Sequence, residues 1–107
     1  MFNSRYKNVS AEEANKLISE DKEFIILDVR TKEEYDNGHI PGAKLVPVQV
    51  LHTKLNELSE YKDKPILVYC ASGGRSPKAV ETLSDNDFQN IYHLRRGISS
   101  WRYNLTR

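Results

Sequence analysis

One pattern constrains the fold of this chain more than any other: short, unbroken apolar runs alternate with amphipathic helical segments. The runs at 24–29 and 65–69 are rich in β-branched residues. Such runs are typical of strands buried on both faces of a parallel sheet. We expect further strands at 43–46 and 91–94, joined through helices by right-handed crossovers. The pattern predicts an α/β fold with a mainly parallel sheet and helices on both faces.

Two of the expected helices begin with a capping box, in which a Ser or Thr and a Glu three residues later cap each other's backbone N–H groups. The box at 10–13 opens a helix over about 11–19, and the box at 31–34 opens a short helix that ends near Gly38. Three leucines at helical spacing predict another helix between the second and third strands: Leu51, Leu55 and Leu58. A closing helix is expected over 97–104.

Size and composition indicate one folded domain, residues 1–107, because 38% of the residues are hydrophobic and 29% are charged. Sixteen Lys and Arg nearly balance fifteen Asp and Glu, so the formal net charge is +1. That balance gives no bulk attraction to nucleic acid or to a membrane surface, and neither is expected as a partner. No apolar stretch has the length of a signal peptide or a membrane span. We expect a monomer in the cytoplasm.

The chain has a single cysteine, Cys70, which follows the apolar run at 65–69. A single thiol forms no internal disulfide, and an unpaired one suits a reducing compartment. Its spacing to the three histidines does not match a zinc site, so no metal and no organic cofactor is expected. Ligands of parallel sheets bind beyond the carboxyl ends of the strands, where this residue is placed. Cys70 is therefore either an inert core residue or a reactive one.

The segment after this strand combines several features of an anion-binding loop. Adjacent glycines let the backbone curl so that several N–H groups face one centre, and a helix N-terminus adds partial positive charge. Arg75 is expected to close the ring with a guanidinium suited to an oxyanion, and Ser76 to be the N-cap before Pro77. The same features favour the thiolate of Cys70. The expected binding loop, besides Cys70 and Arg75, is Ala71, Ser72, Gly73, Gly74 and Ser76.

Each of these features also has an ordinary structural explanation. A cysteine at a strand end is usually a small buried hydrophobic residue. A glycine pair can simply form a turn, an arginine can be a solvated charge, and Ser-Pro can simply start a helix. Their occurrence together, in this order after a buried strand, favours a reactive Cys70.

With these residues the sequence resembles the rhodanese family. The resemblance rests on four motifs in the family's order, at 26–30, 34–43, 68–77 and 94–101. It implies a rhodanese fold with a five-stranded central sheet. It also implies a sulfurtransferase in which Cys70 takes a sulfane sulfur from a donor such as thiosulfate and passes it, as a persulfide, to cyanide, a thiol or a protein thiol. The expected partners are thus a small anionic sulfur donor and a thiol acceptor.

Two alternatives remain beside this interpretation. Cysteine phosphatases and arsenate reductases of related architecture have five residues between the cysteine and the arginine, whereas Cys70 and Arg75 have four between them. The shorter ring suits a persulfide better than a tetrahedral phosphoryl group, which makes phosphatase chemistry the weaker alternative. The other alternative is a non-enzymatic rhodanese module that binds sulfur-carrier partners.

The remaining motif residues are expected to support the site rather than to react. Asp28 and Arg30 are predicted to pair and organise the loops, and His39 to fix a turn by hydrogen bonding. Trp101 is expected in the core. Many relatives that use thiosulfate have a basic residue directly after the cysteine, so Ala71 weakens the case for thiosulfate as the natural donor. Whether Arg95 and Arg96 face the site or the solvent is left open.

Overall fold

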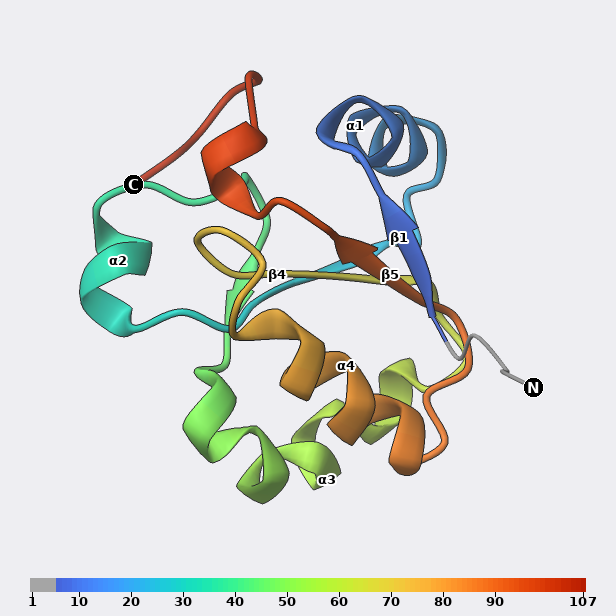
Figure 1. Ribbon diagram of the computed structural model, residues 1–107. Coiled ribbons are helices and arrows are strands. Elements are labelled where there is room, and N and C mark those ends of the chain that lie inside the picture. Colours follow the sequence, from blue (N-terminus) through green and yellow to red (C-terminus); the bar gives the residue numbers. More distant parts are fainter. Residues whose placement is uncertain (1–5) are drawn as a thin grey trace.

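The computed structural model describes residues 6–107, which are built around a five-stranded sheet (Figure 1). Every neighbouring pair of strands is parallel, and the strand order is β1-β5-β4-β2-β3. The predicted α/β class and the five-stranded sheet are therefore confirmed. The strands are β1 (Lys7–Val9), β2 (Ile25–Asp28), β3 (Lys44–Leu45), β4 (Ile66–Tyr69) and β5 (Ile91–Leu94).

Helices of unequal length connect the strands. Both predicted capping boxes are present, with reciprocal bonds between side chain and backbone at α1 and α2. In residues 6–107 no helix is both long and apolar enough to cross a membrane. The α-helices are α1 (Ala11–Glu20), α2 (Lys32–Asp36), α3 (Leu55–Leu58) and α4 (Ser76–Asp85), and the 3₁₀ helices are η1 (Val48–Thr53), η2 (Ser59–Tyr61) and η3 (Ile98–Ser100).

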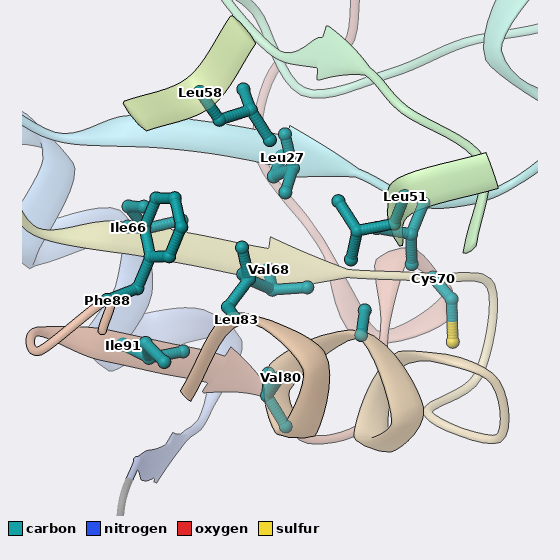
Figure 2. Close-up of a cluster of buried hydrophobic side chains, with 12 residues drawn as sticks. Leu27, Leu51, Leu58, Ile66, Val68, Cys70, Val80, Leu83, Phe88 and Ile91 are labelled. Atoms are coloured by element: carbon teal, nitrogen blue, oxygen red, sulfur yellow. The ribbon is translucent and has the colours of Figure 1, made fainter. Parts of the chain in front are cut away.

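The sheet has an apolar cluster on each face, as its unbroken apolar strands require. Side chains alternate along β4, so that Val68 and Cys70 belong to one cluster while Leu67 and Tyr69 belong to the other. Helices α3 and α4 cover the first cluster (Figure 2). Helix α1 and the buried Trp101 cover the second. The expected core position of Trp101 is confirmed, since this residue is 9% exposed.

The helix expected over 97–104 was wrong, because the structure has only the three-residue η3 there. Gly97 has a φ of +66°, which no right-handed helix contains. The N–H groups of Ile98 and Ser99 bond outside the segment, to the carbonyls of Cys70 (2.9 Å) and Ala71 (3.0 Å). Tertiary contacts thus replace the helical ladder and attach this segment to the loop after β4.

Three smaller corrections concern helix and strand boundaries. The leucine-bearing segment is not one helix but η1, α3 and η2 in succession. Ser76 is the first helical residue and Arg75 is the N-cap, because the Ser76 hydroxyl is engaged by Cys70 and His93 instead of the helix backbone. Strand β1 was not predicted, since three residues with one buried side chain give no apolar run.

Candidate active site

Cys70 lies directly beyond the last residue of β4, at the carboxyl edge of the sheet. The residue is only 1% exposed and contributes to the apolar cluster under α4. Its sulfur nevertheless points away from the aliphatic side chains, toward the loop that follows β4 (Figure 2). Burial of the residue and a polar setting for its sulfur therefore coexist.

Hydrogen-bonding groups of the loop surround the sulfur. The N–H of Gly73 donates to Sγ at 3.2 Å, and the Ser76 hydroxyl lies 3.3 Å from it. Burial opposes ionisation of Cys70, but hydrogen bonds from the Ser76 hydroxyl and from the backbone N–H groups of Arg75, Ser76 and Gly73 outweigh it, so that the thiol pKa is lowered. The loop thus favours a thiolate, the form that acts as a nucleophile.

Two glycines with positive φ, Gly73 in the loop and Gly97 in the segment after β5, let these two stretches of backbone approach each other closely. A Cβ on Gly73, whose φ is +95°, would lie 2.1 Å from the carbonyl oxygen of Arg95. A Cβ on Gly97 would lie 2.5 Å from the carbonyl oxygen of Ala71. The two backbones therefore pack so closely that only glycine, which has no Cβ, fits at these two positions. Gly74 differs, because it has no positive φ and a Cβ there would meet no heavy atom within 4 Å.

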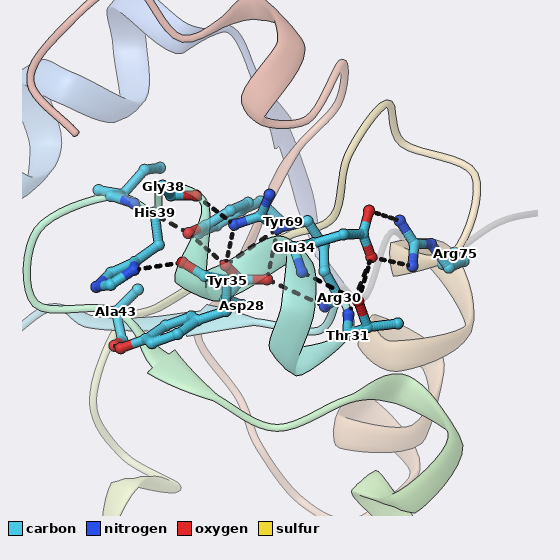
Figure 3. A network of polar contacts seen from close by, with 11 residues as sticks. Asp28, Arg30, Thr31, Glu34, Tyr35, Gly38, His39, Ala43, Tyr69 and Arg75 are labelled. Carbon is cyan, nitrogen blue, oxygen red and sulfur yellow. Dashed lines mark hydrogen bonds and ion pairs between the residues drawn. The ribbon is translucent and has the colours of Figure 1, made fainter. Parts of the chain in front are cut away.

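Arg75 reaches away from its own loop to helix α2 (Figure 3). Its Nη1 and Nη2 donate to Oε1 and Oε2 of Glu34 at 2.8 and 2.9 Å. The Arg75 hydrogen bond holds the pKa of Glu34 at about 2, although partial burial acts in the opposite direction. Both terminal nitrogens of the guanidinium are thus engaged by a carboxylate, and the groups that contact Sγ come from the backbone and from Ser76.

Asp28, the last residue of β2, and Arg30, two positions further along the chain, form a buried ion pair. The carboxylate accepts from Arg30 Nη2 at 2.7 Å and from the Tyr69 hydroxyl at 2.8 Å. Arg30 Nη2 also donates to the Gly38 carbonyl at 2.8 Å, and the Tyr69 oxygen accepts from Ile40 N at 3.1 Å. Burial and the neighbouring Asp28 carboxylate raise the pKa of Tyr69. The network ties β2, β4 and the 38–40 turn together through hydrogen bonds to side chains and backbone.

His39 contacts the turn and not the Cys70 loop. Its Nδ1 lies 2.9 Å from the carbonyl oxygen of Tyr35, and the two rings stack with centroids 3.6 Å apart. Its backbone pairs with Thr106 near the C-terminus. These contacts join the 38–40 turn to helix α2 and to the segment near the C-terminus.

The remaining loop residues provide backbone rather than side-chain contacts. Ala71 is half-buried and Ser72 is exposed. Arg95 and Arg96 are exposed and line a cavity of about 650 Å³ together with Arg102. Within residues 6–107 no group of three or more His, Cys, Asp or Glu side chains is arranged to hold a metal ion.

Sequence reasoning missed several residues that complete the site. Glu34 was identified only as part of a capping box, and nothing local marks it as the partner of a residue 41 positions away. Tyr69 carried a usable signal, since a buried tyrosine at a strand end needs a partner for its hydroxyl. His93 carried another, because a histidine within a buried strand must also be hydrogen-bonded.

These features define an α/β protein whose cysteine lies in a short glycine-containing loop between a strand and a helix, with its sulfur facing a backbone N–H and a hydroxyl. A sequence model of the family described as "Rhodanese-like domain" matches residues 10–104, and the chain belongs to this family. A rhodanese-like domain protein from Staphylococcus aureus has a similar crystal structure, with a TM-score of 0.83 and 34% identity over 94% of this chain and 96% of that one.

Two curated relatives are similar to this chain in sequence. The "Thiosulfate sulfurtransferase GlpE" of Coxiella burnetii (strain RSA 331 / Henzerling II) is 33% identical over 102 residues, covering 91% of this chain and 88% of the relative. The "Uncharacterized protein YqhL" of Bacillus subtilis is 38% identical over 76 residues, covering 71% of this chain. The match spans only 59% of YqhL, so that relative contains sequence with no counterpart in the match.

Proposed function

We propose that this protein is a sulfurtransferase that carries a sulfane sulfur as a persulfide on Cys70. The observation that supports the proposal best is the environment of the Cys70 sulfur. Sγ faces the Gly73 N–H and the Ser76 hydroxyl, and the pKa of the thiol is lowered. The relationship to a thiosulfate sulfurtransferase agrees with this chemistry. The substrates are a small anionic donor such as thiosulfate and a thiophilic acceptor such as cyanide or a thiol.

The reaction consists of two displacements on sulfur. The Cys70 thiolate attacks the outer sulfur of thiosulfate, the S–S bond of the donor breaks, and sulfite leaves with the bonding pair. The acceptor then attacks the outer sulfur of the persulfide, and the Cys70 thiolate leaves. A lowered thiol pKa makes Cys70 a better leaving group in this second step.

The loop stabilises negative charge on whichever sulfur carries it. An S–S bond is about 2.05 Å long, so the persulfide places its outer sulfur further from the apolar cluster and nearer the loop backbone. Inward-facing N–H groups are suited to hold that anion. Arg75 acts by positioning the loop through Glu34, and its guanidinium charge also interacts with Cys70.

The proposal is tested by intact-mass measurement after incubation with thiosulfate. We expect a gain of one sulfur atom that cyanide or dithiothreitol removes, and no gain in Cys70→Ser. Thiocyanate production with thiosulfate and cyanide measures the complete cycle. If the folded wild-type protein gains no sulfur atom after incubation with thiosulfate, the assignment is refuted.

A second candidate is a rhodanese module that holds sulfur or binds a sulfur carrier without turnover. The 1% exposure of Cys70 favours this alternative, because an acceptor must reach the sulfur through the loop. The same experiment separates the two functions. A persulfide that forms but is not discharged by cyanide supports the module, whereas catalytic thiocyanate production supports the enzyme.

A further inference from the structure

His93 is a buried histidine that the two displacement steps leave unused. It lies on β5 and is 3% exposed. In the parallel register it pairs with Val68 of β4 on one side and with Asn8 of β1 on the other. Since side chains alternate along a strand, His93 shares the face of Ile91, which is the face covered by α4. The imidazole is thereby placed between β1 and the first residue of α4.

A continuous chain of hydrogen bonds runs from the cysteine through this imidazole to the edge of the sheet. Cys70 Sγ donates to Ser76 Oγ at 3.3 Å. Ser76 Oγ lies 2.6 Å from His93 Nε2, and His93 Nδ1 lies 2.8 Å from Asn8 Oδ1. An amide oxygen accepts only, so Asn8 requires the proton of neutral His93 to be on Nδ1. Nε2 is then an acceptor, and the Ser76 hydroxyl donates to it.

We propose that His93 is a positioning residue that receives the thiol proton of Cys70 through the Ser76 hydroxyl, with Asn8 fixing its tautomer. The S–H bond of Cys70 breaks and its electron pair stays on Sγ. The released proton joins Ser76 Oγ while the original hydroxyl proton moves to His93 Nε2. The products are a thiolate, an intact hydroxyl that now donates to it, and an imidazolium, with no change in net charge.

Burial lowers the pKa of His93, so the ring is neutral before the transfer and its Nε2 lone pair accepts the hydrogen bond of the Ser76 hydroxyl. The same burial opposes the imidazolium, so the step depends on the thiolate charge formed together with it on Cys70. The titratable groups placed around the chain are Tyr6, whose ring meets the imidazole edge-on at 5.9 Å, and the Arg75 guanidinium, whose charge interacts with Cys70. Tyr6 is half-buried and Arg75 is paired with Glu34.

The inference rests on the proposed function only in treating Cys70 as the nucleophile, and its test needs no sulfur donor. Thiolate absorbance near 240 nm, followed against pH, reports ionisation of the single cysteine without requiring access of a reagent. The informative variant is Asn8→Asp, at an exposed position of β1. A carboxylate against Nδ1–H stabilises the imidazolium.

If His93 takes the proton, Asn8→Asp shifts thiolate formation to lower pH by about one unit. If His93 only fills space, the added negative charge leaves the midpoint unchanged or raises it. The two hypotheses thus predict different outcomes. The shift is expected to vanish when Asn8→Asp is combined with Ser76→Ala or with His93→Gln, because each breaks the chain between the carboxylate and the thiol.

Single variants provide the remaining comparisons. Ser76→Ala and His93→Gln are each expected to raise the midpoint of thiolate formation, and the double variant to raise it no further than either one. His52→Gln, at an exposed position of η1, is the matched control and leaves the midpoint unchanged. Additive effects, or a shift of Asn8→Asp that survives in the Ser76→Ala background, would overturn the relay. Loss of persulfide formation with an intact relay would instead refute the sulfurtransferase proposal.

Discussion

Arg75 and Glu34 meet through two parallel hydrogen bonds of 2.8 and 2.9 Å, which join the Cys70 loop to helix α2. The Glu34 carboxylate also accepts from the N–H of Thr31 at 3.0 Å, as part of the capping box of that helix. One side chain therefore serves both the start of a helix and the shape of the loop (Figure 3). Each side chain of the ion pair is about one-third exposed, so the pair adds little to the stability of the fold. Its main effect is to hold the loop in position against helix α2.

Replacement of Glu34 separates these two roles. Gln also completes a capping box, so Glu34→Gln keeps helix α2 while removing the ion pair. We expect the rate of persulfide formation from thiosulfate to fall about three- to tenfold, equivalent to about 0.6–1.4 kcal/mol. The exposed Glu33→Gln, one position earlier on the same helix, is the control. Equal rates in wild type and Glu34→Gln would show that the pair does not position the loop.

The same ion pair predicts a pH dependence of stability. The pKa of Glu34 is lowered to about 2 in the folded protein, whereas the ordinary value is 4.5. A lowered folded pKa adds stability above the unfolded pKa, and this stability is lost as the pH falls from about 4.5 toward 2. Urea unfolding of wild type and Glu34→Gln should therefore differ by about 0.2–1 kcal/mol at pH 7 and converge at low pH. A difference that does not change with pH would contradict the assignment.

The two adjacent glycines of the loop should respond differently to the same change. Gly73→Ala places a Cβ 2.1 Å from the Arg95 carbonyl oxygen at a φ of +95°, which forces the loop away from its partner. We expect a loss of at least about 1–2 kcal/mol in the free energy of unfolding and of most persulfide formation. Gly74→Ala meets open space and should change neither quantity appreciably. If both variants behave alike, the loop does not adopt this packed conformation.

The framework of the fold could be predicted because its signals are local. Two capping boxes, the apolar runs of the central strands and the strand-to-helix transition after Cys70 are each contained in a few consecutive residues. Strand β1 was missed because Lys7–Val9 has little apolar character, and its place is decided by pairing with Ile91–Leu94 at the far end of the chain. The 97–104 helix was wrong because its N–H groups bond to the loop after β4 instead.

The site was predicted in part for the same reason. The loop at 70–76 is contiguous, so its N–H groups and the placement of Cys70 followed from the sequence alone. The partners of the loop are not contiguous, since Glu34 is 41 residues from Arg75 and Asn8 is 85 residues from His93. Only the folded chain shows that Arg75 pairs with a carboxylate and that the Ser76 hydroxyl faces His93 instead of capping its own helix.

The Tyr69 hydroxyl offers a test of the buried support beneath the site. It donates to Asp28 and accepts from the N–H of Ile40, and Tyr69→Phe leaves both partners buried with one hydrogen bond fewer. We expect a loss of about 1–3 kcal/mol in the free energy of unfolding, measured by urea denaturation. Tyr92→Phe, on a half-buried ring of β5, is the matched control and should lower the free energy of unfolding by less.

The thiolate titration of Cys70 should stay unchanged in Tyr69→Phe, because the hydroxyl lies on the opposite face of β4 from the Cys70 side chain. A shifted titration would mean that the Asp28 network acts on the cysteine directly, and equal stability losses in the two variants would mean that the buried hydroxyl contributes no special support.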